Sequence, residues 1–269
     1  MTDQHEESVA ARFSGAARTY EQVAAVQEHA ALALLGLLDP TPRPRSILDV
    51  GCGTGKLTVQ LKEMFVEAVV IGIDPAPGMI AEARKRYGRR GVQWVVADLF
   101  SYGGKGFSLV TANSMLHWIS PIERAFVRLC RLTAPCGRIA ITVMLEGTLK
   151  ELHGCRQKVA PQKAPPVRLP SASRVLAAAA GAGFLLEEAR VMDLRSVHSS
   201  ARDLLKDLHD AGVTAGAVTG RAPLLTRAEL DRLVEEYESL FRCEEGVFAT
   251  YRVLALRAMF PGGTCTGEN

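Results

Sequence analysis

The chain has 269 residues, of which 48% are hydrophobic and 23% charged, a composition typical of a folded protein with a full core. Its net charge is only +3, and Lys and Arg are interspersed with Asp and Glu, which argues against a nucleic-acid partner. No apolar stretch is long enough to span a bilayer, and the first 15 residues lack the features of a secretory signal. We therefore expect a cytoplasmic monomer without a membrane or nucleic-acid partner.

The six cysteines are widely separated in the sequence. They form no C-x-x-C pair, and no His stands at metal-ligand spacing from them. This spacing predicts reduced thiols and no metal site.

In chain order, the hydrophobic pattern predicts a first helix and then strands that alternate with helices, which indicates a mostly parallel α/β sheet. The first helix is predicted over residues 21–38, with a capping box at Thr19 to Gln22 and a proline-rich end. Five apolar runs have the length of buried strands, at residues 46–50, 69–73, 92–96, 107–112 and 139–143. Helices are expected between them at residues 56–64, 78–87 and 122–132, the last capped by Ser120 before Pro121.

Beyond residue 143 the alternation stops, and a proline-rich stretch leads into an alanine-rich helix over residues 171–180. The last two strands are predicted at residues 184–191 and 248–256, with helices at 200–210 and 227–241 between them. We divide the chain into an N-terminal lid segment with its helix (1–45), a ligand-binding core (46–143), an inserted loop and helix (144–183), C-terminal strands with a helical insertion (184–258) and a tail (259–269).

The segment SILDVGCGTGK places Gly51, Gly53 and Gly55 between a strand and a helix. Glycines there let the backbone approach a ligand, and the amides of the helix N-terminus point at it. The G-x-G-x-G spacing differs from the dinucleotide fingerprint, in which two residues precede the third glycine. Asp49, just before the loop, would repel a pyrophosphate but suits an ammonium or sulfonium group. The pattern therefore favours a cationic ligand.

Polar residues also end the next three strands. Asp74 stands where a carboxylate accepts hydrogen bonds from a ribose diol. Asp98 can accept from an exocyclic amine, Leu99 can offer its amide to an adenine edge, and Asn113 lies where the reacting centre is expected. Because the carboxyl ends of parallel strands meet at one edge of a sheet, these groups together predict an adenosine with a charged amino-acid tail. Each Asp taken singly is equally typical of a turn.

The motifs LDVGCGTG, IGIDPAPGMIAEAR and ADLF, with Asn113, resemble class I S-adenosylmethionine-dependent methyltransferases over residues 46–143. This resemblance implies a Rossmann-like α/β sheet that is mostly parallel, with an antiparallel last strand, an N-terminal helical lid and inserted substrate-recognition helices. It implies an S-adenosylmethionine site formed by Gln27, Asp49, Gly51, Gly53, Gly55, Asp74, Pro75, Met79, Asp98, Leu99 and Asn113.

More narrowly, the chain resembles the malonyl-acyl carrier protein O-methyltransferases of biotin synthesis. The matching segments are RFSGAARTYEQVAAVQ at 12–27, NSMLHW at 113–118, GTLKEL at 147–152, SARDLLKDLHDAGV at 200–213 and TYRVLALRA from 250. It departs from the family pattern at Pro135-Cys136-Gly137 and at Pro166-Val167-Arg168. The resemblance implies methyl transfer to the free carboxylate of a malonyl thioester on acyl carrier protein or coenzyme A.

A carboxylate with a pKa of about 4 is ionised at neutral pH, so this transfer needs no general base. A neutral phenol can hold such a nucleophile without blunting it, and Tyr20 is the candidate catalytic residue, unless it only anchors the first helix on the core. A segment contacting both ligands would act as a lid. His117 and Trp118 are expected to wall the substrate pocket. An acidic carrier protein is expected to dock on cations, for which the candidates are Lys150, Arg168, Arg202 and Lys206.

Three alternatives remain open at this level. The same fold can methylate another small carboxylic acid or a quinone-type carbon. A nicotinamide-dependent oxidoreductase is disfavoured by Asp49 and by Lys56 after the third glycine. A non-catalytic nucleoside-binding partner of another protein would bind the cofactor without turnover.

Overall fold

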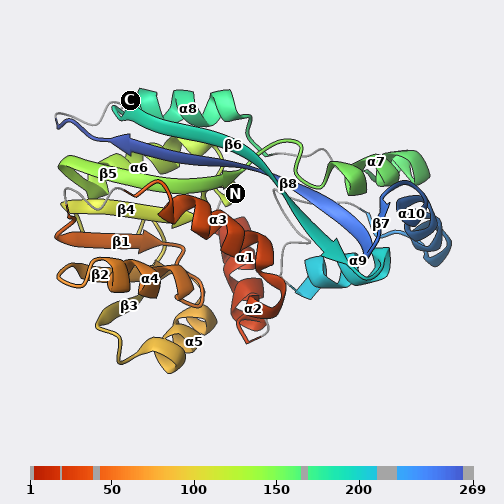
Figure 1. Cartoon of the computed structure of the whole chain (residues 1–269), viewed down its shortest axis with the longest axis horizontal. Helices are drawn as coiled ribbons and strands as arrows, with labels where there is room; N and C mark the ends of the chain where they lie inside the picture. Colours follow the sequence, from red (N-terminus) through yellow and green to blue (C-terminus); the bar gives the residue numbers. More distant parts are fainter. Residues whose placement is uncertain (1–2, 19, 39–42, 165–168, 211–222, 263–269) are drawn as a thin grey trace.

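A computed structural model describes residues 3–18, 20–38, 43–164, 169–210 and 223–262. Within these ranges the strands form one sheet in the order β3-β2-β1-β4-β5-β8-β6, and β7 pairs with β8 (Figure 1). The strands are β1 (Ser46–Val50), β2 (Val69–Asp74), β3 (Val92–Val96), β4 (Phe107–Asn113), β5 (Thr133–Met144), β6 (Leu185–His198), β7 (Arg242–Cys243) and β8 (Gly246–Met259). Strands β1 to β5 pair in parallel, whereas β8 is antiparallel to both β5 and β6.

Helices precede the sheet, connect its strands and cap one end of it. They are α1 (Asp3–Ala16), α2 (Tyr20–Val23), α3 (Ala25–Leu35), α4 (Lys56–Met64), α5 (Pro77–Tyr87), α6 (Ile122–Leu132), α7 (Lys150–Val159), α8 (Ala172–Gly181), α9 (Ala201–Asp210) and α10 (Arg227–Leu240), with short 3-10 turns at Leu116–Trp118 and Pro161–Lys163. None of the helices in the described part of the chain is both long and apolar enough to cross a membrane.

Two apolar layers enclose the sheet because successive side chains of a strand point to opposite faces. In β5, Ile139 and Ile141 pack with α6 and α8 on one face, whereas Ala140 joins the cluster of α3, α4 and α5 on the other. The predicted α/β class, with a mostly parallel sheet and an antiparallel last strand, is therefore confirmed.

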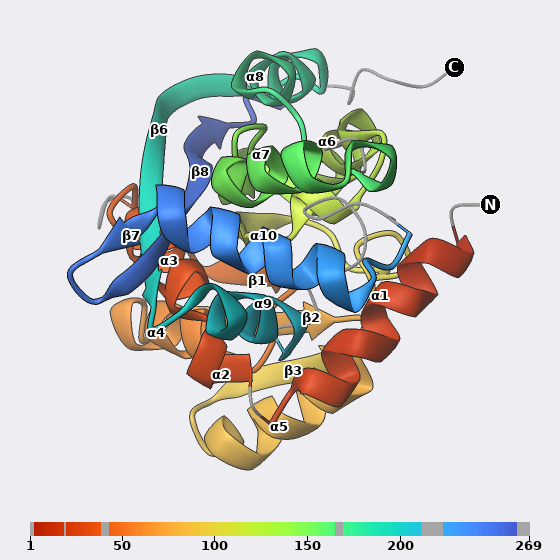
Figure 2. The same cartoon turned by 90° about the vertical axis from the view of Figure 1, so that its right-hand side faces the viewer.

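The antiparallel pair β6 and β8 extends beyond the other strands and carries a separate group of helices (Figure 1). This distal helical group comprises α7, α9 and α10, whose apolar sides meet around Tyr237. Val26 of α3 and Trp118 pack against the same cluster. The distal helical group is therefore continuous with the N-terminal helices, and both lie over the side of the sheet where the parallel strands end (Figure 2).

The N-terminal region differs from its sequence-based prediction. The single helix expected over 21–38 is two helices, α2 and α3, because the backbone at Ala24 (φ −93°, ψ 21°) leaves the helical conformation. The helix α1 was not predicted, and the capping box at Thr19 falls outside the described residues.

Two smaller expectations are also wrong. Ser120 does not cap α6, since Pro121 is the N-cap residue and makes no side-chain cap. Cys52, Cys136, Cys155 and Cys243 are free thiols, but Cys130 is disulfide-bonded, so the cysteines are not all reduced.

Candidate active site

A cavity of about 370 Å³ lies at the carboxyl ends of β1, β2 and β4, and we call it the main cavity. Its volume is in the range of small-molecule binding sites. Predicted site residues among its lining are Tyr20, Gly51, Gly53, Asp74, Pro75, Met79, Asp98, Leu99, Asn113 and Trp118. The fold therefore brings together groups that lie up to about a hundred residues apart in sequence, as expected for the switch region of an open α/β sheet.

A second cavity of about 210 Å³, the side cavity, lies between the glycine loop and α3. Gln27 and Asp49 line it, together with the charged residues Glu21, Glu28 and Lys56. Tyr20, Gly51, Gly53 and Asn113 line both cavities. A nucleoside in the main cavity and a charged amino-acid tail in the side cavity would meet beside these four residues.

The glycine loop has a backbone conformation that residues other than glycine rarely adopt. Gly51, Gly53 and Gly55 have φ values of 67°, 55° and 91°. A Cβ atom on Gly55 would stand 2.4 Å from the ring of Trp94, which lies beneath the loop. Trp94 was not predicted as part of the site; it lines neither cavity and supports the loop by packing against Gly55.

Asp49 is buried below the glycine loop. Its carboxylate accepts hydrogen bonds from the hydroxyls of Thr58 at 2.6 Å and Thr111 at 2.8 Å. Burial nevertheless raises its pKa to about 6, so its charge is only partly compensated by these neutral donors. Such a carboxylate would be stabilised by a cationic group in the side cavity.

Asp74 is also buried, and its carboxylate bridges two turns. It accepts hydrogen bonds from the amides of Gly53 at 2.9 Å and Ala76 at 2.8 Å. Burial raises its pKa to about 6. Each oxygen of a carboxylate has more than one acceptor site, so a ribose diol can still bind.

Asp98 has a different environment at the rim of the main cavity. Its Oδ1 accepts from the amides of Phe100 at 2.6 Å and Ser101 at 3.0 Å. Burial acts to raise its pKa, but the hydrogen bonds from Ser101 and Phe100 outweigh burial and lower it. Asp98 is thus charged at neutral pH and shapes the loop that contains Leu99.

Gln27 joins the side cavity to the lid helix α3. Its backbone carbonyl accepts from Asn113 Nδ2 at 2.9 Å. Its side-chain Oε1 is buried and has no hydrogen-bond partner among the residues that the structure describes. Because a buried acceptor without a partner is costly, this atom fits a ligand donor such as an ammonium group.

Tyr20 begins α2 where the two cavities meet. Its ring contacts Phe13 edge-on, with centroids 6.1 Å apart. Burial, and next the charge of Asp74, raise the pKa of its phenol, so it is a neutral hydrogen-bond donor at physiological pH.

The two residues expected to wall the substrate pocket are placed differently. Trp118 lines the main cavity and contacts Phe13, with ring centroids 5.7 Å apart. His117 is not among the cavity-lining residues, because it is buried behind Trp118 with ring centroids 5.3 Å apart. Burial lowers the pKa of His117 to about 3, so its ring is neutral at physiological pH.

The cations expected to dock a carrier protein lie on the distal helical group. Lys150 begins α7 and Lys206 lies on α9, and both are exposed. Arg202 on α9 is paired with Asp231 of α10, which offsets its charge. Arg168 lies outside the described residues.

The helix α1 contributes to the site, which was not predicted from the sequence. Ala10 and Phe13 line the main cavity, and Ser14 accepts a hydrogen bond from the amide of Gly78 at 2.7 Å, which attaches α1 to the start of α5. The available signals were the family-like segment at residues 12–27 and, within it, the apolar pair Phe13 and Ala17, which pack on Met79. Within the described residues, no group of three or more His, Cys, Asp and Glu could hold a metal ion.

The parallel sheet, the glycine loop and the strand-end carboxylates define a class I, Rossmann-like S-adenosylmethionine-dependent methyltransferase. The cofactor of this class is S-adenosylmethionine, and Gln27, Asp49, Asp74 and Asp98 are chemically suited to it. A family profile described as a methyltransferase domain matches residues 47–137.

Relatives that match over most of their length identify the family within this class. The chain is 35% identical to the malonyl-[acyl-carrier protein] O-methyltransferase of Hahella chejuensis over 91% of this chain and 87% of that protein. It is 31% identical to the enzyme of the same description from Geobacter sulfurreducens over 90% and 94% of the two chains. The chain belongs to the malonyl-[acyl-carrier protein] O-methyltransferase family.

The fold has solved counterparts at low sequence identity. The YcgJ protein of Bacillus subtilis aligns with a TM-score of 0.61 at 14% identity, covering 88% of this chain and all of that one. At this identity the likeness concerns the fold alone.

Proposed function

We propose that this enzyme transfers the methyl group of S-adenosylmethionine to the free carboxylate of a malonyl thioester on acyl carrier protein, giving the malonyl methyl ester for biotin synthesis. Membership of the malonyl-[acyl-carrier protein] O-methyltransferase family supports this substrate. The structural observation that carries it is the position of Tyr20, a neutral phenol between a cavity suited to the nucleoside and one suited to the amino-acid tail.

The side chains of the two cavities would bind different parts of the cofactor. Asp74 would accept from the ribose hydroxyls, and Asp98 with the amide of Leu99 would contact the adenine edge. Gln27 Oε1 would accept from the ammonium group, and Asp49 would favour the nearby positive charge. When bound, S-adenosylmethionine supplies an electrophilic methyl group on a sulfonium.

The chemistry demands positioning rather than proton transfer. The malonyl carboxylate is already ionised at neutral pH, so Tyr20 needs only to donate a hydrogen bond that holds one oxygen in line. Phe13, Met115 and Trp118 form an apolar wall of the main cavity and would limit access of water to the reacting oxygen.

We further propose that the distal helical group recognises the carrier protein, with Lys150, Arg202 and Lys206 facing its acidic surface. Exposed cations of this kind act mainly on association rate and on orientation. The docking role expected for Arg168, which lies outside the described residues, stays a prediction. We also propose that the enzyme is a cytoplasmic monomer that does not bind nucleic acid. The small net charge of +3 supports the last of these expectations.

The test is methyl transfer from labelled S-adenosylmethionine to malonyl-acyl carrier protein, followed by mass. We expect a malonyl methyl ester and S-adenosylhomocysteine in equal amounts. Acetyl-acyl carrier protein, which lacks the free carboxylate, is the matched control, and malonyl-coenzyme A measures the contribution of the carrier protein. Methylation of another small acid or of a quinone, with none on the malonyl thioester, would overturn this substrate assignment.

A further inference from the structure

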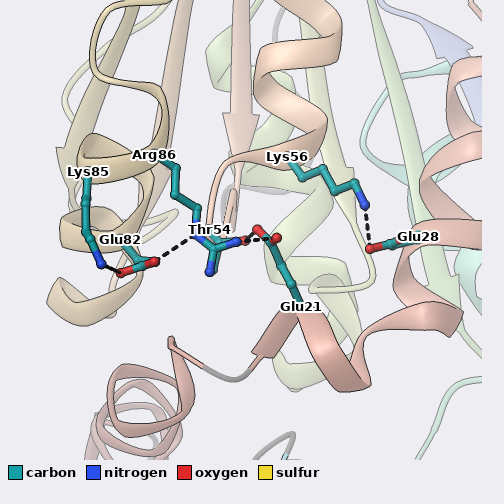
Figure 3. Close-up of polar contacts among 7 residues, drawn as sticks. All are labelled: Glu21, Glu28, Thr54, Lys56, Glu82, Lys85 and Arg86. Carbon is teal, nitrogen blue, oxygen red and sulfur yellow. Dashed lines mark hydrogen bonds and ion pairs between the residues drawn. The ribbon is translucent and has the colours of Figure 1, made fainter.

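Glu21, the residue after Tyr20, connects the lid to two separate elements of the core (Figure 3). Its Oε1 accepts a hydrogen bond from the Thr54 hydroxyl at 2.8 Å. Its Oε2 forms an ion pair with Arg86 of α5. One carboxylate therefore joins α2 to both the glycine loop and the helix that follows β2.

Both partners of Glu21 are themselves held in place. Thr54 is buried between the two glycines Gly53 and Gly55. Arg86 also bonds Glu82, one helical turn earlier, at 2.7 Å, and Lys85 lies 3.8 Å from the same carboxylate (Figure 3). The side chains of Glu21 and Arg86 are 24% and 28% exposed, so solvent screens this pair less than a fully exposed one.

The helix α2 depends on such contacts. It has four residues, far below the length at which an isolated helix is stable in water, and it ends at the non-helical Ala24. Within the described part of the chain, no hydrogen bond holds the Tyr20 hydroxyl, and its ring meets Phe13 only edge-on. The ring of Tyr20 also packs on the buried cluster of Ala17, Ala76 and Met79. Glu21 adds the polar attachment of α2 to the core, and this attachment limits the directions that the Tyr20 phenol can take.

We propose that Glu21, held by Arg86, is a positioning residue that fixes the Tyr20 phenol at the junction of the two cavities and couples it to the glycine loop through Thr54. This inference rests on the proposed role of Tyr20 in binding the substrate carboxylate. Because Thr54 belongs to the glycine loop, the same carboxylate ties the position of α2 to that loop.

The first test uses Arg86→Gln, because Arg86 lines neither cavity. We expect kcat with malonyl-acyl carrier protein to fall about tenfold, while the Kd of S-adenosylhomocysteine changes less than about twofold. Glu21→Gln keeps an acceptor for Thr54 but loses the ion pair, and it should reproduce the loss of kcat. Lys85→Gln removes a neighbouring, largely exposed cation whose ion pair within the described residues is with Glu82 and not with Glu21, and it should retain wild-type kcat.

A double variant separates positioning from general stability. In a Tyr20→Phe background, Arg86→Gln should lower kcat little further, because the phenol hydroxyl that Glu21 directs is already absent. The same fractional loss in both backgrounds, or wild-type kcat in Arg86→Gln, would overturn the inference.

Hydrogen exchange gives a readout that does not depend on the substrate. With S-adenosylhomocysteine bound, Arg86→Gln should speed amide exchange in residues 20–35, and Lys85→Gln should not. Unchanged exchange in Arg86→Gln would also overturn the positioning role. If wild-type enzyme fails to methylate the malonyl thioester while exchange responds as expected, the proposed substrate is wrong and the attachment of α2 by Glu21 stands.

Discussion

The side chain of Asn113 links the end of β4 to the lid. Its Nδ2 donates to the backbone carbonyl of Gln27 at 2.9 Å, and its Oδ1 accepts from the Thr142 hydroxyl at 2.6 Å. Asn113 also lines both cavities, so one amide fixes the relative positions of the strand end, the lid helix and the cofactor site.

Asn113→Asp is therefore expected to weaken the lid while preserving the strand. Aspartate still accepts from Thr142 but cannot donate to Gln27, and it leaves a carboxylate facing a carbonyl. We expect kcat/KM, measured by steady-state kinetics, to fall by a factor that corresponds to about 1–3 kcal/mol of transition-state stabilisation. Asn113→Ala, which breaks both bonds, should lose more; equal kcat/KM for Asn113→Asp and wild type would contradict the link.

Tyr20→Phe removes only the phenol hydroxyl. Because this group is expected to hold the substrate carboxylate and not the cofactor, kcat should fall at least about tenfold. The Kd of S-adenosylmethionine, measured by calorimetry, should remain near its wild-type value. Retained turnover would mean that Tyr20 only packs against Phe13.

Asp74→Ala should act on the cofactor instead. Losing a charged acceptor for two ribose hydroxyls is expected to raise the Kd of S-adenosylhomocysteine about 10- to 100-fold, since hydrogen bonds to charged groups contribute about 1.5–3 kcal/mol. Asp193→Ala is a matched control, because Asp193 is a half-exposed carboxylate of β6. A wild-type Kd in Asp74→Ala would reject the ribose role.

The buried carboxyls Asp49 and Asp74 predict a pH dependence of stability and of binding. Burial raises both pKa values to about 6, above their unfolded value of 3.8, so the folded protein binds more protons than the unfolded chain between these limits. Their contribution to the free energy of unfolding should therefore increase as pH falls from about 7 to about 5. Cofactor affinity should decrease over the same interval, because a cationic ligand favours the ionised carboxylates.

Denaturant unfolding without ligand at several pH values tests this expectation. Asp49→Asn should have a smaller rise in the free energy of unfolding on acidification than wild type, and should be more stable at pH 7 while binding cofactor less tightly. An identical pH profile for the two proteins would show that Asp49 does not carry the buried charge.

Gly55→Ala tests the support of the glycine loop by Trp94. The added Cβ would meet the indole ring at 2.4 Å, and the residue would have to keep a φ of 91°. We expect a loss of about 2–3 kcal/mol or more in the free energy of unfolding, seen as a lower Tm. Adding Trp94→Leu to the Gly55→Ala variant should relieve part of the clash but not the backbone strain. A wild-type Tm in Gly55→Ala would contradict this packing.

The central βαβ units could be predicted from sequence because their signals are local. Apolar runs such as Ile47–Val50 and glycines directly after them identify buried strands and the ligand-binding turn, and α4 and α6 begin and end where predicted. Asp74 and Asp98 could be assigned to one site because parallel strands must end at the same edge.

The features of the site that could not be predicted depend on contacts between segments that lie far apart in the sequence. The helix α1 has only a weak apolar pattern and acquires its role by packing Phe13 against Tyr20 and Trp118. His117 and Trp118 are neighbours in one short turn, and only the fold shows that Trp118 lines the main cavity while His117 is buried. The helix break at Ala24 likewise has no signal in the hydrophobic pattern.

The sequence by itself determined the class of fold, the cofactor and the family, since these are encoded in short motifs whose spacing reflects backbone geometry. Only the tertiary structure decided that Tyr20 lies at the junction of two cavities and that Glu21 attaches it to Arg86 and Thr54. The physical reason is that a charge pair across 65 residues, from Glu21 to Arg86, has no periodic signature in the chain and forms only when the sheet brings α2 and α5 together.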